Sequence, residues 1–454
     1  MGIEVVNPTM LQVAWIAHKK EFPKDCLSFI VKGTFELVQN ELAKQIDSMP
    51  VTGDEFDLFN PNKGLIYESD FAYFKENADL LLKANCHTPQ QQPMTQCNVT
   101  FSVAGQSRTL TVIGDRYAMP SMMGESYSDP EPFTTMPINF EHSYGGVGFE
   151  KNTVGKGINS NESGVKWMHN VFDSSLGEKE PASFGPINRA WAQRSKKLGT
   201  YDEKWQKERW PWFPEDFEWA YFNAAHESMQ FDGYLNGDES MAFENLHPEY
   251  EYFECRLPNI LPRCFAVEPD GDEDFREIEL KLDTVYVDMT VQQVQLVWRG
   301  IAQVKSQTFT ELSHVYVQQE SLEGPNASKD DHQAAFNVLI TPSTEFDMEP
   351  EVEEQDQSAV QEAPDDSIKA DPFENAIEQS KIQLLAAGFS AVSIDGIFSS
   401  ANPAEKISAE IQAMGYSSAE ADELMAKSKE NTKQTLIDQG LSSAHIDILF
   451  PSGS

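Results

Sequence analysis

A histidine beside carboxylates is the pairing that a general base or a metal site uses, and three such groupings in this sequence are candidates. The groupings are Glu141 with His142, His226 with Glu227, and His247 with Glu249 and Glu251. No two histidines stand four residues apart, so no pair shares one helix face as metal ligands do. The alternative for each is a structural histidine that caps a turn or fills the core.

The catalytic and cofactor-binding motifs that we sought are absent from the sequence. It contains no P-loop, no HExxH and no GxSxG. The stretch "GKGINS" (155–160) lacks the third glycine of a dinucleotide fingerprint. The stretch "DGDED" (270–274) resembles the start of an EF-hand loop, but Phe275 and Lys281 replace the required glycine and glutamate. We therefore expect no enzymatic activity, no cofactor and no bound metal.

The five cysteines contain no CxxC pair and are odd in number. This pattern supports neither a zinc ribbon nor a thioredoxin-type site. We expect reduced, mostly buried thiols in a cytoplasmic protein. The N-terminus shows no secretory signal, and no apolar stretch approaches the ~20 residues that span a bilayer.

A formal net charge of −39 restricts the classes of partner. Phosphate contacts need a basic patch, so we expect neither nucleic-acid binding nor a membrane-surface role. Two interpretations of the charge remain. It either keeps the protein soluble, or it forms an acidic face that steers a basic protein partner.

Strand patterns dominate both ends of the body. "LQVAWIAHKK" alternates apolar and polar residues, and "CLSFIVKGTFELV" reads as one long strand. "QCNVTFSVAGQSRTLTVIGDRYAM" predicts a hairpin that turns at Gly105. Strand patterns return near residue 250. We predict an α+β protein, whose β-rich body has two packed β subdomains and a helical insertion.

The helical insertion would hold the densest aromatic stretch, "ERWPWFPEDFEWAYFNAAHESMQ" (208–230). Pro214 followed by two acids resembles a helix start, and Phe217, Tyr221, Phe222 and Ala225 then fall on one helix face. We expect most of these rings to be core. The tryptophans that precede this helix are better candidates for a partner-facing surface; they are Trp205, Trp210 and Trp212.

The C-terminal part of the sequence differs in composition from the body. Residues 345–371 hold eleven acids and one lysine, which predicts a disordered linker. Residues 372–454 contain a threefold repeat of a helix followed by glycine and an apolar residue. We predict a small all-α protein-binding domain there, with Phe389, Tyr416 and Leu441 as candidate contacts. The body would comprise residues 1–344.

The body resembles a known family at its glycine-rich loop "YGGVGFEKNTVGKG" (144–157) and at the stretches 181–230, 235–258 and 282–300. It is similar to the bacterial domain-of-unknown-function family 2169 over residues 3–317. Such proteins are thought to act as adaptors or chaperones in type VI secretion, where they hold a toxic effector. The resemblance implies a non-enzymatic factor that loads an effector onto the VgrG or PAAR spike.

Our hypothesis is therefore an adaptor whose partner is a secreted effector or its spike protein. Its candidate contacts are Tyr144 in the glycine-rich loop, the three tryptophans and the three residues of the C-terminal repeat. Two alternatives stay open. One is a metal- or carboxylate-dependent hydrolase that uses Glu141, His142 or His226, and the other is a structural subunit of a larger assembly. The sequence does not predict an oligomeric state.

Overall fold

The computed structural model describes residues 3–19, 25–56, 64–119, 126–268, 275–304 and 312–340. All of them belong to the first of two compact units of the chain, residues 1–346. The predicted linker and helical domain lie outside the described residues, and so do Phe389, Tyr416 and Leu441.

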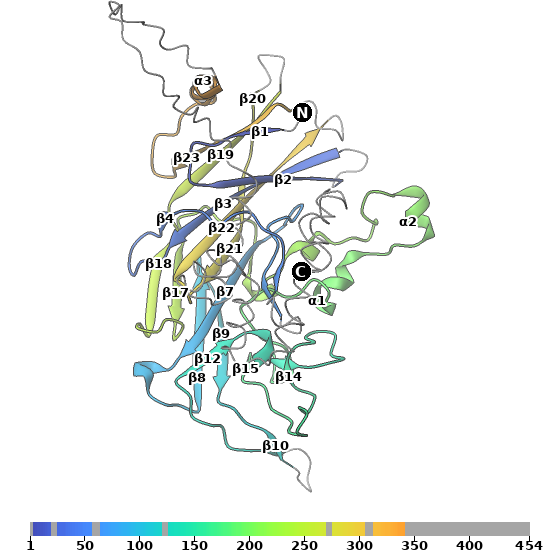
Figure 1. Ribbon diagram of the computed structural model, residues 1–454, viewed down its shortest axis with the longest axis vertical. Coiled ribbons are helices and arrows are strands. Elements are labelled where there is room, and N and C mark those ends of the chain that lie inside the picture. The colour runs from blue at the N-terminus through green and yellow to red at the C-terminus, as the bar shows by residue number, and fades with distance from the viewer. Residues whose placement is uncertain are drawn as a thin grey trace, which may run out of the picture. The chain divides into compact units, whose positions relative to one another are not determined.

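β-Strands form most of the regular structure (Figure 1). They are β1 (Glu4–Val6), β2 (Gln12–His18), β3 (Asp25–Glu36), β4 (Lys44–Ile46), β5 (Glu55–Phe56), β6 (Leu65–Tyr67), β7 (Ala78–His87), β8 (Gln96–Val103), β9 (Gln106–Ile113), β10 (Ala118–Met119), β11 (Ser126–Tyr127), β12 (Thr135–Ile138), β13 (Tyr144–Gly145), β14 (Lys156–Gly157), β15 (Val171–Phe172), β16 (Gln230–Phe231), β17 (Ser240–Glu244), β18 (Tyr252–Arg256), β19 (Ile260–Val267), β20 (Phe275–Ile278), β21 (Lys281–Asp288), β22 (Gln293–Val304) and β23 (His314–Ser321).

The helices are few and mostly a single turn. They are α1 (Ala192–Ser195), α2 (Glu203–Glu208), α3 (Lys329–Ile340) and the 3-10 helices η1 (Pro89–Gln91), η2 (Phe140–His142), η3 (Lys196–Leu198), η4 (Trp219–Phe222) and η5 (Glu227–Met229). In the described part of the chain, no helix has the length and apolar character needed to cross a membrane.

The largest sheet has the strand order β12-β7-β21-β22-β3-β2, with β16 beside β7 and β4 beside β3. Its long strands β3 and β22 pair antiparallel over twelve residues and are buried along most of their length. Alternation along β3 sends Leu27, Phe29 and Val31 into the main apolar core. The intervening Ser28 and Lys32 are also buried, on the opposite face.

A five-stranded sheet, β15-β9-β8-β17-β18, packs against the same apolar core. The hairpin of β8 and β9 confirms the prediction from sequence. Its two turn residues, Ala104 and Gly105, both have positive φ angles, which is the turn that matches the twist of paired strands.

A four-stranded sheet, β1-β23-β19-β20, adds its inner face to this core. Its other face carries Phe265, Phe275 and Tyr316, and α3 covers them with Phe336. Helix α3 begins at a capping box, in which Ser328 Oγ accepts the backbone N–H of Asp331. One continuous core therefore joins all three larger sheets, in place of the two β subdomains that we predicted.

The predicted α+β class is wrong. The described residues are mostly β-sheet with short helices, and the all-α domain is no part of the described structure. The predicted helix after Pro214 is replaced by the single 3-10 turn of η4. One reason is that a distant side chain accepts backbone N–H groups of this segment. Asp79 accepts the backbone N–H groups of Ala224 and Ala225, so this segment needs no helical ladder.

Candidate partner-binding surface

Residues 200–215 form a loop with a closed neck, which we call the aromatic arm. At the neck, Asp216 accepts the backbone N–H of Thr200 at 2.9 Å and its hydroxyl at 2.7 Å. These bonds lower the pKa of the Asp216 carboxyl. Gly199 adopts a φ of +77°, and a Cβ there would lie 2.8 Å from Asp216 Oδ1. The neck therefore requires glycine and holds both ends of the arm together.

Two of the three predicted tryptophans stabilise the arm from within. Trp205 Nε1 donates to the backbone oxygen of Trp212 at 2.8 Å, and Asp202 caps α2 by accepting the Trp205 N–H. The ammonium of Lys19 lies 4.9 Å from the centre of the Trp212 ring. Both rings are half-buried. Trp205 and Trp212 thus have structural partners and are weaker candidates for a docking contact.

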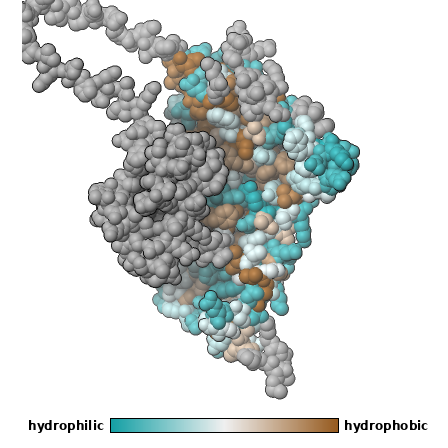
Figure 2. All heavy atoms as spheres, turned by 45° about the vertical axis from the view of Figure 1, so that its right-hand side comes forward, coloured by the Kyte–Doolittle hydropathy of each residue, from teal (hydrophilic) through white to brown (hydrophobic). Residues whose placement is uncertain are grey.

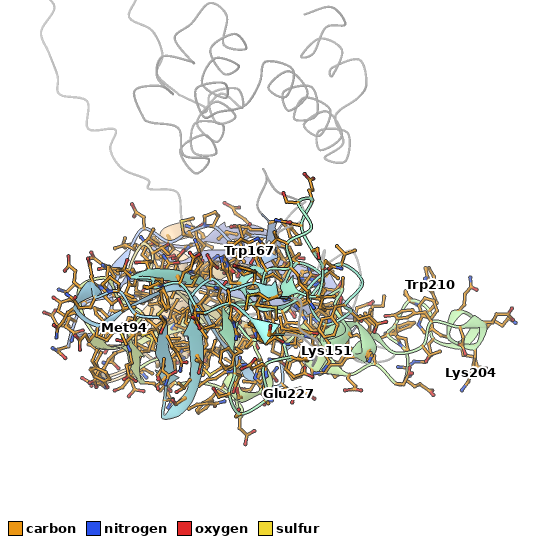
Figure 3. All side chains as sticks on the ribbon, turned by 90° about the horizontal axis from the view of Figure 1, so that it is seen from below. Met94, Lys151, Trp167, Lys204, Trp210 and Glu227 are labelled. Atoms are coloured by element: carbon orange, nitrogen blue, oxygen red, sulfur yellow. The ribbon has the colours of Figure 1, made fainter. Side chains whose placement is uncertain are left out.

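Trp210 is different, because 66% of its surface is exposed. Its backbone N–H donates to the Trp205 oxygen, which fixes the place of the residue in the arm. Figure 3 shows Trp210 and Lys204 at the outer end of the arm, away from the sheets. A large ring that is exposed on a fixed loop is typical of the residues that anchor protein interfaces.

Tyr201 is a further exposed ring on the arm that sequence reasoning missed. It is 48% exposed and packs edge-on against Trp205, with 4.7 Å between ring centroids. No local sequence signal singles it out from the other tyrosines. Its proximity to the tryptophans depends on the neck between Thr200 and Asp216, which joins residues sixteen positions apart.

The charges on the arm nearly cancel, unlike those of the whole chain. It carries three basic side chains (Lys204, Lys207, Arg209) and four acidic ones (Asp202, Glu203, Glu208, Glu215). On the face shown in Figure 2, hydrophobic residues form separate small patches among hydrophilic ones. Apolar contact through the exposed rings is therefore the chemistry that the arm offers to a partner.

Phe213, at the end of the arm, packs with the rings that follow the arm. Only Phe222 among the rings of this stretch is buried, so the predicted core position holds for that ring and not for most of them. Phe213 stacks on Phe217 at 4.2 Å, and Trp219 and Phe222 stack at 6.0 Å. Tyr73 joins them from another segment, 5.3 Å from Phe222. This cluster gives the arm a hydrophobic base.

A buried ion pair ties the base of the arm to the body. Arg194 in α1 donates two hydrogen bonds to Glu68, and both side chains are almost fully buried at 2% and 5% exposure. Arg194 Nε also donates to the backbone oxygen of Tyr221, in the aromatic base. No local pattern indicates this pair, because Glu68 and Arg194 are 126 residues apart along the chain.

Tyr144, a predicted contact, lies in the glycine-rich loop and is half-buried. Its ring meets Phe149 and His169 edge-on, at 5.5 and 5.6 Å. The structure therefore groups Tyr144 with the loop and not with the arm rings. The predicted contacts thus lie on separate surfaces, and only Trp210 is largely exposed among those in the described residues.

The three histidines that we considered as possible bases or metal ligands form hydrogen bonds within their own loops. His142 Nδ1 lies 2.7 Å from Asn139 Oδ1, and His226 Nδ1 accepts the backbone N–H of Ser228. His247 Nδ1 accepts two backbone N–H groups of the turn that follows it. Burial lowers the pKa of His142 and of His226 to about 4, so both rings are neutral at pH 7.

Glu141 and the cysteines also occupy positions in which they stabilise the fold. Glu141 accepts the backbone N–H of Gly64 at 2.9 Å. All five cysteines are buried, as we expected for most of them. Within the described ranges, no cluster of three or more His, Cys, Asp or Glu side chains is placed to hold a metal ion.

Comparison with known proteins identifies the family. Residues 23–299 match the model of a family described as an uncharacterized protein conserved in bacteria (DUF2169). The match contains the arm, the glycine-rich loop and most of the large sheet. Searches of curated proteins and of solved structures found no match. On the extent of the family match, the chain belongs to the bacterial domain-of-unknown-function family 2169.

Proposed function

We propose that this protein is an adaptor that binds a type VI secretion effector and helps to load it onto the VgrG or PAAR spike. The observation that carries the proposal is the exposure of Trp210. Burying an indole in a partner's pocket removes apolar surface from water, and tryptophans are frequent hot spots of protein interfaces.

The fixed neck of the arm supports the same proposal. A loop held at Thr200 and Asp216 presents Trp210 without having to order itself on binding. Preorganisation of this kind reduces the entropy lost on association. The acidic body would then steer a basic effector toward the arm, while the rings make the close contact. The proposal involves no catalytic step.

The test compares the full-length protein with Trp210→Ala, each purified by affinity from native lysate of the source bacterium and analysed by mass spectrometry. The proposal predicts stoichiometric recovery of a toxin-like, PAAR or VgrG protein with the unaltered chain. Loss of a hot-spot tryptophan costs about 2 kcal/mol or more, which is roughly a thirtyfold loss of affinity. Recovery with Trp210→Ala should fall accordingly.

Tyr252→Ala is the matched control, because Tyr252 is also an exposed ring, 55% accessible, but lies in β18. It should recover the partner as well as the unaltered chain does. If every form came back alone and monomeric, the adaptor proposal would be abandoned. Assays for bound metal and hydrolase activity would then follow.

A further inference from the structure

Beside the glycine-rich loop lies a solvent-open hollow of about 430 Å³, which none of the functions considered so far uses. It is lined by Asp115, Gly155, Lys156, Asn159, Ser160, Asn161, Val165 and Trp167. Its volume lies within the roughly 300–1,000 Å³ of typical small-molecule pockets. Trp167 and Trp210 lie well apart in Figure 3, so the hollow is separate from the aromatic arm.

The glycine-rich loop gives the hollow a rigid wall. Asn152 is fully buried and its Nδ2 donates to the backbone oxygens of Phe140 and Tyr144. Gly155 packs so closely on this core that a Cβ there would lie 2.5 Å from Asn152 Nδ2. Only glycine fits in that space, so the backbone on either side of Lys156 is held by packing.

The hollow contains one ion pair that leaves it without net charge. Lys156 Nζ lies 3.2 Å from Asp115 Oδ1, and both groups are partly exposed. Asn170, which is fully buried, donates to the same carboxylate oxygen at 2.9 Å. Although burial alone raises the pKa of Asp115, these partners lower it below its usual value. Asp115 is therefore an ionised hydrogen-bond acceptor with a fixed position.

The remaining polar side chains add hydrogen-bonding groups without charge. Asn159 and Ser160 are exposed at the rim. Asn161 Oδ1 accepts the backbone N–H groups of Ser163 and Val165, which leaves its NH₂ group as the donor. The hollow thus combines acceptors and donors around two apolar side chains, Val165 and the half-buried indole of Trp167.

We propose that this hollow is a binding site for a neutral saccharide. Each sugar hydroxyl both donates and accepts, which suits an ionised Asp115, a charged Lys156 and the two amides. The C–H face of a sugar ring offers the apolar surface that packs on an indole. A phosphate or carboxylate ligand would find no net positive charge in the hollow, because Asp115 already pairs with Lys156. A wholly apolar ligand would bury this ion pair without further hydrogen-bond partners.

The test incubates the full-length protein with a printed array of neutral and anionic glycans, followed by titration with the neutral oligosaccharide that binds best. Trp167→Ala should weaken that binding by about tenfold or more, because it removes the stacking surface. Ser160→Trp should weaken it as well, because a large ring fills the hollow from an exposed position. Tyr252→Ala should bind as the unaltered chain does.

Thermal unfolding of each variant shows whether the fold is retained, and Ser160→Trp keeps the test valid if Trp167→Ala does not fold. Binding of no glycan, or of anionic glycans alone, would overturn the saccharide assignment. So would unchanged affinity in a folded Ser160→Trp variant.

Discussion

His169 is a buried titratable side chain whose two ring nitrogens both lack a hydrogen-bond partner among the described residues. Only 1% of its surface is exposed. Tyr144 and Phe172 meet its ring edge-on. Burial, with the nearby charges of Arg116 and Lys156, lowers the pKa of His169 to about 4. The ring is therefore neutral in the folded protein at pH 7.

Stability should fall as the pH drops from about 6.5 to about 4. In this window the unfolded chain binds a proton on His169 and the folded chain does not, so protonation favours unfolding. The difference between the pKa of His169 in the folded chain and in the unfolded chain corresponds to a loss of at most about 3 kcal/mol in the free energy of unfolding. His169→Leu should remove this contribution to the pH dependence of stability, because leucine does not titrate. At pH 7 the substitution should lower the free energy of unfolding by less than about 1.5 kcal/mol.

Urea denaturation at pH 7 and at pH 4.5 measures both effects. His142 and His226 have pKa values of about 4 as well, so the variant should retain part of the acid dependence. If His169→Leu lost as much stability between the two pH values as the unaltered chain, the assignment of a neutral, unpartnered His169 would be wrong.

At the scale of elements, the pair of Glu68 and Arg194 connects α1 to the segment that follows β6. Glu68→Ala would leave the Arg194 guanidinium buried beside the carbonyls of Ile187 and Tyr221 without its counter-charge. Removing one partner of a buried pair typically costs about 3–5 kcal/mol. We expect a loss of this size in the free energy of unfolding, measured with urea.

Lys207→Ala is the matched control for that experiment. Lys207 pairs with Glu203 on α2 at 3.4 Å, but both side chains are largely exposed. Exposed pairs of this kind contribute about 0.3–0.5 kcal/mol. Equal losses in the two variants would show that Glu68 and Arg194 do not anchor the base of the arm.

The strands were predictable from sequence because their signal is local. The alternation along β2 and the turn at Gly105 between β8 and β9 both depend on neighbouring residues. The arm was not predictable in the same way. Its neck joins Thr200 to Asp216, and Asp79 provides the acceptors that replace a helix after Pro214. Contacts between distant residues of this kind leave no periodic pattern in the sequence.

The two candidate sites differ in how far the sequence could predict them. Trp210 stood out because of its residue type and its place among prolines, but its exposure depends on the folded arm. The hollow could not be predicted. Its Asp115, Lys156 and Trp167 come from three separated segments, and only the folded glycine-rich loop brings them together.

For the molecule as a whole, the net charge of −39 and the near-neutral arm suggest a division of roles. A strongly charged surface accelerates encounters with a partner of opposite charge over a distance of about a Debye length. Close contact then depends on apolar groups that need little reordering. In this account the acidic surface selects a basic effector, and Trp210 provides the anchor.

Photo-crosslinking in the source bacterium shows which protein contacts Trp210 in the cell. A benzophenone amino acid placed at position 210 reports the protein that touches the outer end of the arm, and the same label at position 252 reports background contacts. The account predicts a product at position 210 that contains a secreted effector, a PAAR or a VgrG protein, and that is absent at position 252. No product at position 210, or the same products at both positions, would contradict it.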